Sequence, residues 1–180
     1  MTSANLLGLS GSLRQGATNR KLLREAARLF GECTYTEADL KLPLYDGDDE
    51  DATGIPASVT ALADQIAAAD GILISTPEYN SGPSGVIKNA LDWVSRVHEN
   101  PWQGKPVAVM SAAAGRTGGM CAGITLRTFL MPFQPRVVPG PPVMLAASFE
   151  GFDENGHLIS EVYTKNLQTL MNNLATDMGR

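Results

Sequence analysis

Short apolar runs alternate with amphipathic segments along the whole chain, and this alternation limits the fold more than any other feature. It is typical of a parallel sheet, because each parallel strand needs a long crossover that is usually a helix. The predicted strands span residues 5–9, 33–38, 71–76, 106–112 and 136–145, and the predicted helices span residues 18–30, 57–69, 83–97, 119–133 and 160–178. We therefore predict an α/β fold, a doubly wound sheet of five parallel strands with helices on both faces.

Three segments refine this prediction. The run Ile72-Leu73-Ile74 is apolar without a break, as expected for a strand with helices on both faces, whereas the strand over 33–38 is polar enough for a sheet edge. Residues 139–142 include three prolines, which lack the N–H of a central ladder, so the last strand is an edge or contains a bulge. The acidic residues 46–51 indicate a solvated loop.

Composition narrows the class of protein. With 180 residues, 43% of them hydrophobic, we expect residues 1–180 to form a single domain. The two cysteines, Cys33 and Cys121, indicate neither a disulfide framework nor a zinc site, and they read as small buried residues. A net charge of −5 disfavours a nucleic-acid partner, and no apolar run approaches the roughly 20 residues that span a membrane. We expect a cytoplasmic protein, without a secretory signal, that acts on small molecules.

The first candidate binding loop, residues 10–19, joins the first strand to the first helix. It contains two glycines, several hydroxyl side chains and one cation, Arg14. Small residues expose backbone N–H groups, and the start of the following helix carries about half a positive charge. A glycine-rich turn alone is a common helix connection. The loop chemistry nevertheless suits a phosphate group.

Two further loops follow the third and fourth predicted strands. Residues 76–85 bring an aromatic ring, Tyr79, together with the amide of Asn80 and the carboxylate of Glu78, which suits a flat heteroaromatic ring. Residues 111–119 are small and permissive. Because the carboxyl ends of parallel strands meet at one edge of a sheet, the three loops are expected to surround one nucleotide-like ligand.

The same residues resemble a known family. Gly11-Ser12-Leu13-Arg14 is followed by Asn19 and later by residues 76–93, TPEYNSGPSGVIKNALDW. The chain is similar to NAD(P)H-dependent FMN reductases, a flavodoxin-like family that includes quinone, azo-dye and chromate reductases. The resemblance covers residues 6–127 and all three loops in order.

This resemblance implies FMN as cofactor and NADPH or NADH as co-substrate. Hydride would pass from NAD(P)H to the flavin and then to a quinone, an azo compound, a metal oxyanion or free flavin, by a ping-pong mechanism. The protein would supply positioning and electrostatics, without an obligatory catalytic residue. The dinucleotide fingerprint G-x-G-x-x-G is absent, so NAD(P)H would dock on the flavin.

The resemblance also implies the cofactor-binding residues. These are Ser10, Ser12, Arg14, Thr18 and Asn19 around the phosphate, and Pro77, Glu78, Tyr79, Asn80, Ser111 and Gly115 beside the ring. The chain departs from the family pattern at Ala17, where members commonly have serine, and at residues 112–114, which are alanines in a loop that is often richer in glycine. The family commonly forms homodimers or homotetramers, which implies an interface that includes Asn89, Trp93, Val97 and Trp102.

Alternative interpretations remain at this point. A flavodoxin-like electron carrier would bind FMN without reacting with nicotinamide, and a flavin-free regulatory domain would keep only the fold. Arg116 and Arg127 are either surface cations or contacts to dinucleotide phosphates. His98 and His157 lack the spacing of metal ligands and are expected in loops.

Overall fold

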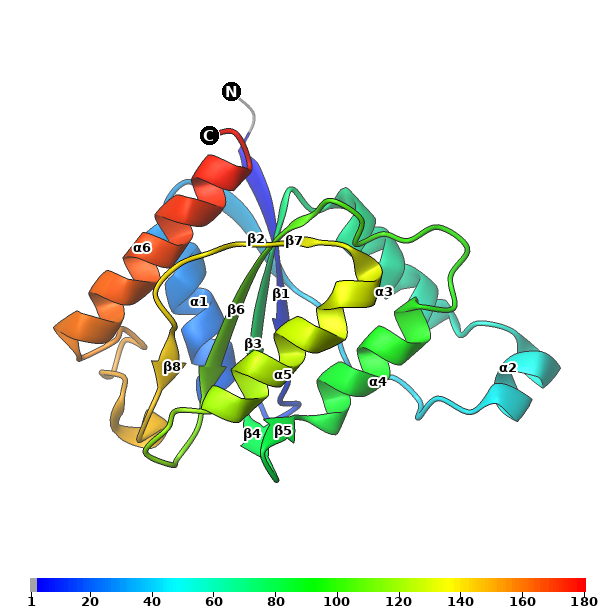
Figure 1. Ribbon diagram of the computed structural model, residues 1–180, viewed down its shortest axis with the longest axis horizontal. Coiled ribbons are helices and arrows are strands. Elements are labelled where there is room, and N and C mark those ends of the chain that lie inside the picture. The colour runs from blue at the N-terminus through cyan, green and yellow to red at the C-terminus, as the bar shows by residue number, and fades with distance from the viewer. Residues whose placement is uncertain (1–2) are drawn as a thin grey trace.

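The computed structural model describes residues 3–180 and contains one parallel sheet at its centre (Figure 1). Its strand order is β2 (Cys33–Glu37), β1 (Ala4–Ser10), β3 (Gly71–Thr76) and β6 (Pro106–Ala112). Two short strands, β7 (Arg136–Val137) and β8 (Met144–Leu145), both pair with β6 at the far edge. The predicted doubly wound parallel sheet is confirmed, with β2 at an edge as expected.

Helices cover both faces of the sheet (Figure 1). One face packs against α1 (Thr18–Phe30) and α6 (Glu161–Asp177), and the other against α3 (Ala57–Ala68), α4 (Gly85–Val94) and α5 (Met120–Leu130). Leu73 belongs to the first of these cores, whereas Ile72 and Ile74 belong to the second. Burial on both faces explains why the β3 sequence is apolar without a break.

The predicted last strand, residues 136–145, is interrupted in the structure, so this prediction was only partly right. Val138 N–H still donates to Val107 O, and Ser111 N–H donates to Val143 O, at 2.9 and 3.0 Å. Between these contacts lie residues 139–142, whose prolines cannot donate to a ladder. The strand therefore survives only as β7 and β8.

The acidic stretch was predicted as a loop, and this was wrong for most of its length. Residues 47–51 lie in α2 (Gly47–Thr53), which projects from the body in Figure 1 and buries no residue. The Asp46 side chain accepts from Asp48 N–H at 2.9 Å and caps the helix, and acidic residues fill the first turn. Negative side chains stabilise a helix start, so the pattern that indicated a solvated loop also favours a short helix.

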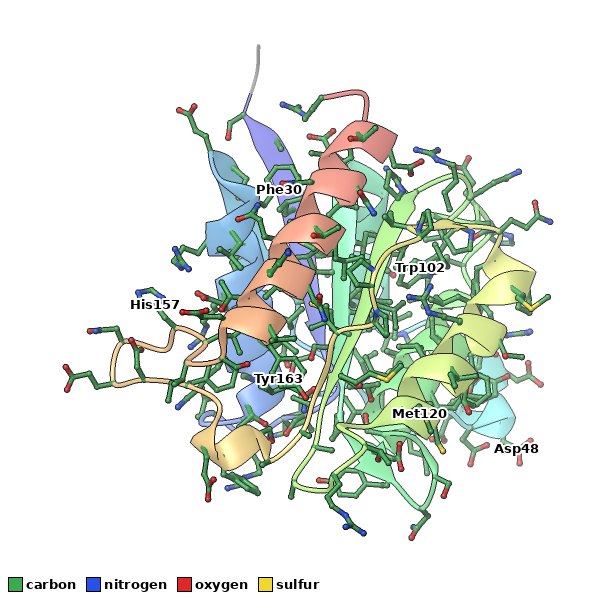
Figure 2. The ribbon with its side chains drawn as sticks, turned by 60° about the vertical axis from the view of Figure 1, so that its left-hand side comes forward. Phe30, Asp48, Trp102, Met120, His157 and Tyr163 are labelled. Carbon is green, nitrogen blue, oxygen red and sulfur yellow. The ribbon has the colours of Figure 1, made fainter. Side chains whose placement is uncertain are left out.

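Two residues expected at an interface between copies lie inside this chain, which corrects that prediction. Trp93 and Trp102 are 1% and 2% exposed, and Figure 2 shows Trp102 within the body. Trp93 Nε1 donates to Pro43 O at 2.8 Å, and Asn89 Nδ2 donates to the same oxygen at 2.8 Å. Across residues 3–180, no helix combines the length and apolar character that crossing a membrane requires.

Candidate functional site

The carboxyl ends of β3 and β6 are tied together by one side chain, that of Asn19 at the start of α1. Its Oδ1 accepts from Ser75 Oγ at 2.7 Å and from Ala112 N–H at 3.1 Å, while its Nδ2 donates to Ala112 O at 3.0 Å. Asn19 is 3% exposed. A buried amide with all these partners fixes the first loop against two strand ends.

The first loop is shaped by its own hydroxyl groups. Ser10 Oγ donates to Ser12 O at 3.1 Å and accepts from Ser12 N–H at 3.2 Å, and Ser12 Oγ accepts from Arg14 N–H at 3.4 Å. At Gly11 a Cβ atom would lie 2.7 Å from Thr76 Oγ1. Only glycine allows this close approach between the first and second loops.

The end of this loop presents several open donors. Ala17 precedes α1 and offers no side-chain cap, and within residues 3–180 the N–H groups of Thr18 and Asn19 have no protein acceptor. Arg14 is exposed, and its guanidinium has no partner in that part of the chain. Unpaired N–H groups at a helix start beside a free cation favour an anion.

The second loop forms a hairpin of β4 (Glu78–Tyr79) and β5 (Gly82–Pro83). Its two turn residues, Asn80 and Ser81, have φ angles of 50° and 62°, which a tight turn of this handedness requires. The turn leaves Tyr79 63% exposed. Glu78 Oε2 accepts from Ala122 N–H at 3.1 Å, which anchors the hairpin to the start of α5.

The third loop is anchored by Ser111, which is 1% exposed. Its Oγ donates to Gly118 O at 2.7 Å. Gly118 has a φ of +61°, and a Cβ there would collide with Met144 O, so the loop requires glycine at this position. Gly115 lies exposed at the tip of the loop.

The three loops surround a cavity of about 200 Å³. Its lining consists of Ser12, Arg14, Gly16, Ala17, Thr18, Asn19, Pro77, Glu78, Tyr79, Ala112, Ala113, Ala114, Ser148 and Phe149. Seven of the residues expected at the site are among them, whereas Ser10, Asn80, Ser111 and Gly115 are outside the lining. The side chains of Ser10 and Ser111 are buried and hold the loops instead.

Two lining residues, Ser148 and Phe149, lie outside the three predicted loops. They belong to η2 (Ser148–Glu150), which follows β8. Ser148 Oγ lies 3.0 Å from Thr18 Oγ1, and Ser148 N–H donates to Ala113 O at 3.2 Å, while Phe149 is 72% exposed. No local motif marks this segment, but the end of a fifth parallel strand has to reach the same edge of the sheet.

The arrangement agrees with the family comparison. Residues 4–150 match the family model described as NADPH-dependent FMN reductase, which covers most of the chain. The chain belongs to the NADPH-dependent FMN reductase family. FMN is the cofactor of this family and NAD(P)H its reductant, so both predictions are confirmed.

Relatives of known activity include an NAD(P)H-dependent FMN reductase of Pseudomonas aeruginosa, 42% identical over 158 residues, which are 87% of this chain and 85% of the relative. A quinone reductase of Escherichia coli K12 is 39% identical over 139 residues, 76% of this chain and 74% of the relative. The solved structure of FerB, a flavoenzyme NAD(P)H:(acceptor) oxidoreductase from Paracoccus denitrificans, has a TM-score of 0.86 at 30% identity and covers 97% of this chain and 96% of FerB. The chain is therefore an NAD(P)H-dependent oxidoreductase.

The remaining candidate residues of this FMN reductase family member lie away from the cavity. Arg116 is exposed and Arg127 is half-buried, and neither lines the cavity. His98 and His157 are in connecting segments, as predicted, and residues 3–180 contain no cluster of side chains suited to a metal ion. Cys33 and Cys121 are only partly buried, and burial raises the pKa of the Cys33 thiol.

Proposed function

We propose that this chain transfers hydride from NAD(P)H, by way of bound FMN, to a small acceptor in a ping-pong reaction. The acceptor would be a quinone, an azo compound, a metal oxyanion or free flavin. One observation carries the proposal: Thr18 and Asn19 at the start of α1, the exposed Arg14 and the exposed Tyr79 all line the same cavity. A phosphate at one end and a flat ring at the other fit these groups.

The phosphate end of the proposed site consists of Ser12, Arg14 and Thr18, with the N–H groups of Thr18 and Asn19. Arg14 would supply charge, while the helix start supplies oriented donors that need no rearrangement when the anion arrives. Ser10 holds the loop in shape, and Asn19 fixes it to β3 and β6. Oxygen-rich anions are the ligands that such a set prefers.

The ring end consists of Pro77, Glu78 and Tyr79, with Asn80 at the turn and the loop of Ser111 and Gly115 opposite. When bound there, the flavin supplies the redox chemistry, because it accepts hydride and returns electrons to an acceptor. The chain's part is to orient the ring and to present loop N–H groups to developing negative charge. The buried partners of Glu78 and Ser111 keep these loops in place.

The relatives support a small-molecule acceptor, since the Escherichia coli relative is named a quinone reductase and a Burkholderia relative a 2-hydroxy-1,4-benzoquinone reductase.

We also propose that the chain assembles as a homodimer or homotetramer. Size-exclusion chromatography at micromolar concentration tests this, and elution as a monomer would refute it.

The decisive experiment is an anaerobic absorbance titration of the FMN-reconstituted protein with NADPH and then NADH. Bleaching of the bound flavin by either nucleotide is expected. Flavin that binds but stays oxidised would instead indicate an electron carrier, and failure to bind flavin would refute the site.

Two variants test the two ends of the site separately. Arg14→Ala should weaken FMN binding by about 10- to 100-fold, because a charged hydrogen-bond partner of the phosphate is lost. Tyr79→Ala should alter flavin fluorescence and turnover with a smaller effect on affinity. Unchanged FMN affinity in Arg14→Ala would show that the phosphate lies elsewhere.

A further inference from the structure

A second cavity, of about 310 Å³, lies between α5 and the segment that joins β7 to β8. Figure 1 shows this segment returning from the end of α5 to β8. The lining comprises Val109, Met110, Ser111, Gly123, Arg127, Pro139, Gly140, Pro142, Val143 and Met144. It shares no residue with the lining of the cavity proposed for the cofactor. Strand β6 separates the two cavities: Ser111 lines the second cavity, and Ala112 lines the cofactor cavity.

Arg127 is the single charged residue in the lining of this second cavity. It is half-buried, and within residues 3–180 its guanidinium has no hydrogen bond, ion pair or aromatic contact. The other half-buried arginine of residues 3–180, Arg20, is paired, because it contacts Glu37 at 2.8 Å. Burial without a compensating partner lowers the pKa of Arg127.

An unpaired guanidinium in such a place is unfavourable, because it loses contact with water and gains no acceptor. An unbranched apolar side chain on α5 would pack against the same walls without this penalty. The planar fork of Arg is suited to a carboxylate that accepts two parallel hydrogen bonds. A carboxylate would therefore supply the acceptor that Arg127 does not find within residues 3–180.

The walls define the rest of the ligand. Pro139, Pro142, Val143 and Met144 present mainly apolar surface, and the Ser111 hydroxyl hydrogen is already donated to Gly118 O. A small inorganic anion would leave these walls in contact with water, and an Asp or Glu side chain from another copy would fill only a small part of the volume. A carboxylate on a flat or aliphatic body satisfies both the charge and the walls.

We propose that this second cavity binds a small organic carboxylate, which pairs with Arg127 and lays its apolar body against Val143 and Met144. The site is separate from the cofactor cavity, but both border the loop that begins at Ser111. Binding there would contact Ser111, whose hydroxyl holds the third loop through Gly118. An occupied site would thus restrain a loop that also lines the cofactor cavity, through Ala113 and Ala114.

The test is calorimetric titration of the FMN-loaded protein with 2-naphthoate, with the uncharged 2-naphthamide as matched ligand. Arg127→Met keeps an unbranched side chain of similar length and removes the charge, and Arg116→Met is the control, because that arginine is exposed and outside both cavities. We expect native protein and Arg116→Met to bind 2-naphthoate equally. Arg127→Met should bind it at least about 10-fold more weakly, the loss typical of a charged hydrogen bond.

Thermal unfolding gives a second readout that does not depend on reductase activity. Arg127→Met should be at least as stable as the native protein without ligand, and 2-naphthoate should raise the Tm of the native protein alone. The proposal is refuted if native protein binds no 2-naphthoate at millimolar concentration, if Arg127→Met binds it equally, or if 2-naphthamide binds as well. A change of oligomeric state in Arg127→Met would also refute it, because the carboxylate would then belong to another copy.

Discussion

At the scale of single residues, Ala17 stands out because it lies at the start of α1 without a polar side chain. It occupies the N-cap position of α1 with an extended backbone, is 7% exposed and offers no side-chain acceptor. Ala17→Ser should raise the free energy of unfolding without FMN by about 1 kcal/mol, because serine caps the open N–H groups. It should also tighten FMN binding, since its hydroxyl donates to phosphate. Urea unfolding and fluorescence titration measure the two effects.

Ala17→Cys is the control for this substitution, since its thiol occupies the same position and is somewhat larger than a hydroxyl, but accepts hydrogen bonds only weakly. Equal gains in the two variants would show that packing, and not the hydroxyl, is responsible.

The sequence predicted that three loops meet at one edge of the sheet, but not what each side chain contacts. Asn19 was expected beside the phosphate, yet its side chain is occupied by Ser75 and Ala112. Ser10 was expected there too, and its hydroxyl is bonded to Ser12. Small polar residues near a binding loop serve equally well as ligands or as internal supports, and only the three-dimensional arrangement separates these roles.

At the scale of elements, α1 holds, at two points, the segment that completes the cavity between the three loops. Thr18 contacts Ser148, and seven residues later Glu25 accepts from His157 Nδ1 at 3.1 Å and from Leu158 N–H at 3.3 Å. Figure 2 shows His157 on the loop beside α1. Burial alone would raise the pKa of Glu25, but hydrogen bonds from Arg28, His157 and Leu158 outweigh it and lower the pKa.

A lowered pKa means that the Glu25 carboxylate stabilises the fold above its unfolded pKa of about 4.5, and that this stability is lost as the pH falls through the folded value. Glu25→Gln should therefore reduce the free energy of unfolding at pH 7 by about 2 kcal/mol. The difference from the native protein should shrink below pH 4.5. Urea unfolding at pH 7 and pH 3.5 measures it, with Asp64→Asn as the control, because the Asp64 carboxylate is exposed and has no partner within residues 3–180. A difference that is the same at both pH values would contradict the argument.

Elements with a strong hydrophobic pattern were predicted closely, and those defined by backbone chemistry were not. Helix α1 begins and ends where its amphipathic pattern predicts, at Thr18 and Phe30. The last strand was predicted over residues 136–145 with an edge or a bulge at its prolines, and it breaks there into β7 and β8. Helix α2 was missed because nothing in it is buried. Hydrophobic periodicity reports burial, so it says little about a helix held by a cap and by polar contacts such as that of Glu50 with Arg96.

At the scale of the whole molecule, the site arises because four strand ends meet at one edge of the sheet. The alternation of strands and helices predicts this convergence, since it places every loop that follows a strand on the same side. It could not predict that Trp93 and Trp102 pack within the chain, because an apolar stripe looks the same whether it faces a core or a second copy.

Because the strand ends converge, we expect FMN binding to affect all of these loops together, and FMN removal to reverse the effect. A ligand that contacts loops from four strands should slow amide hydrogen exchange in residues 10–19, 77–82, 112–119 and 146–151 together, although they lie far apart in the sequence. At 1,000 times its Kd, FMN adds about 4 kcal/mol of stability, or roughly 8–16 °C in Tm for a domain of this size. The Arg14→Ala variant should show the same slowing of amide exchange, but only at a higher FMN concentration. Slowing confined to residues 10–19 would mean that the cofactor binds the phosphate loop without bridging the other strands, and the arrangement proposed for the ring would then be wrong.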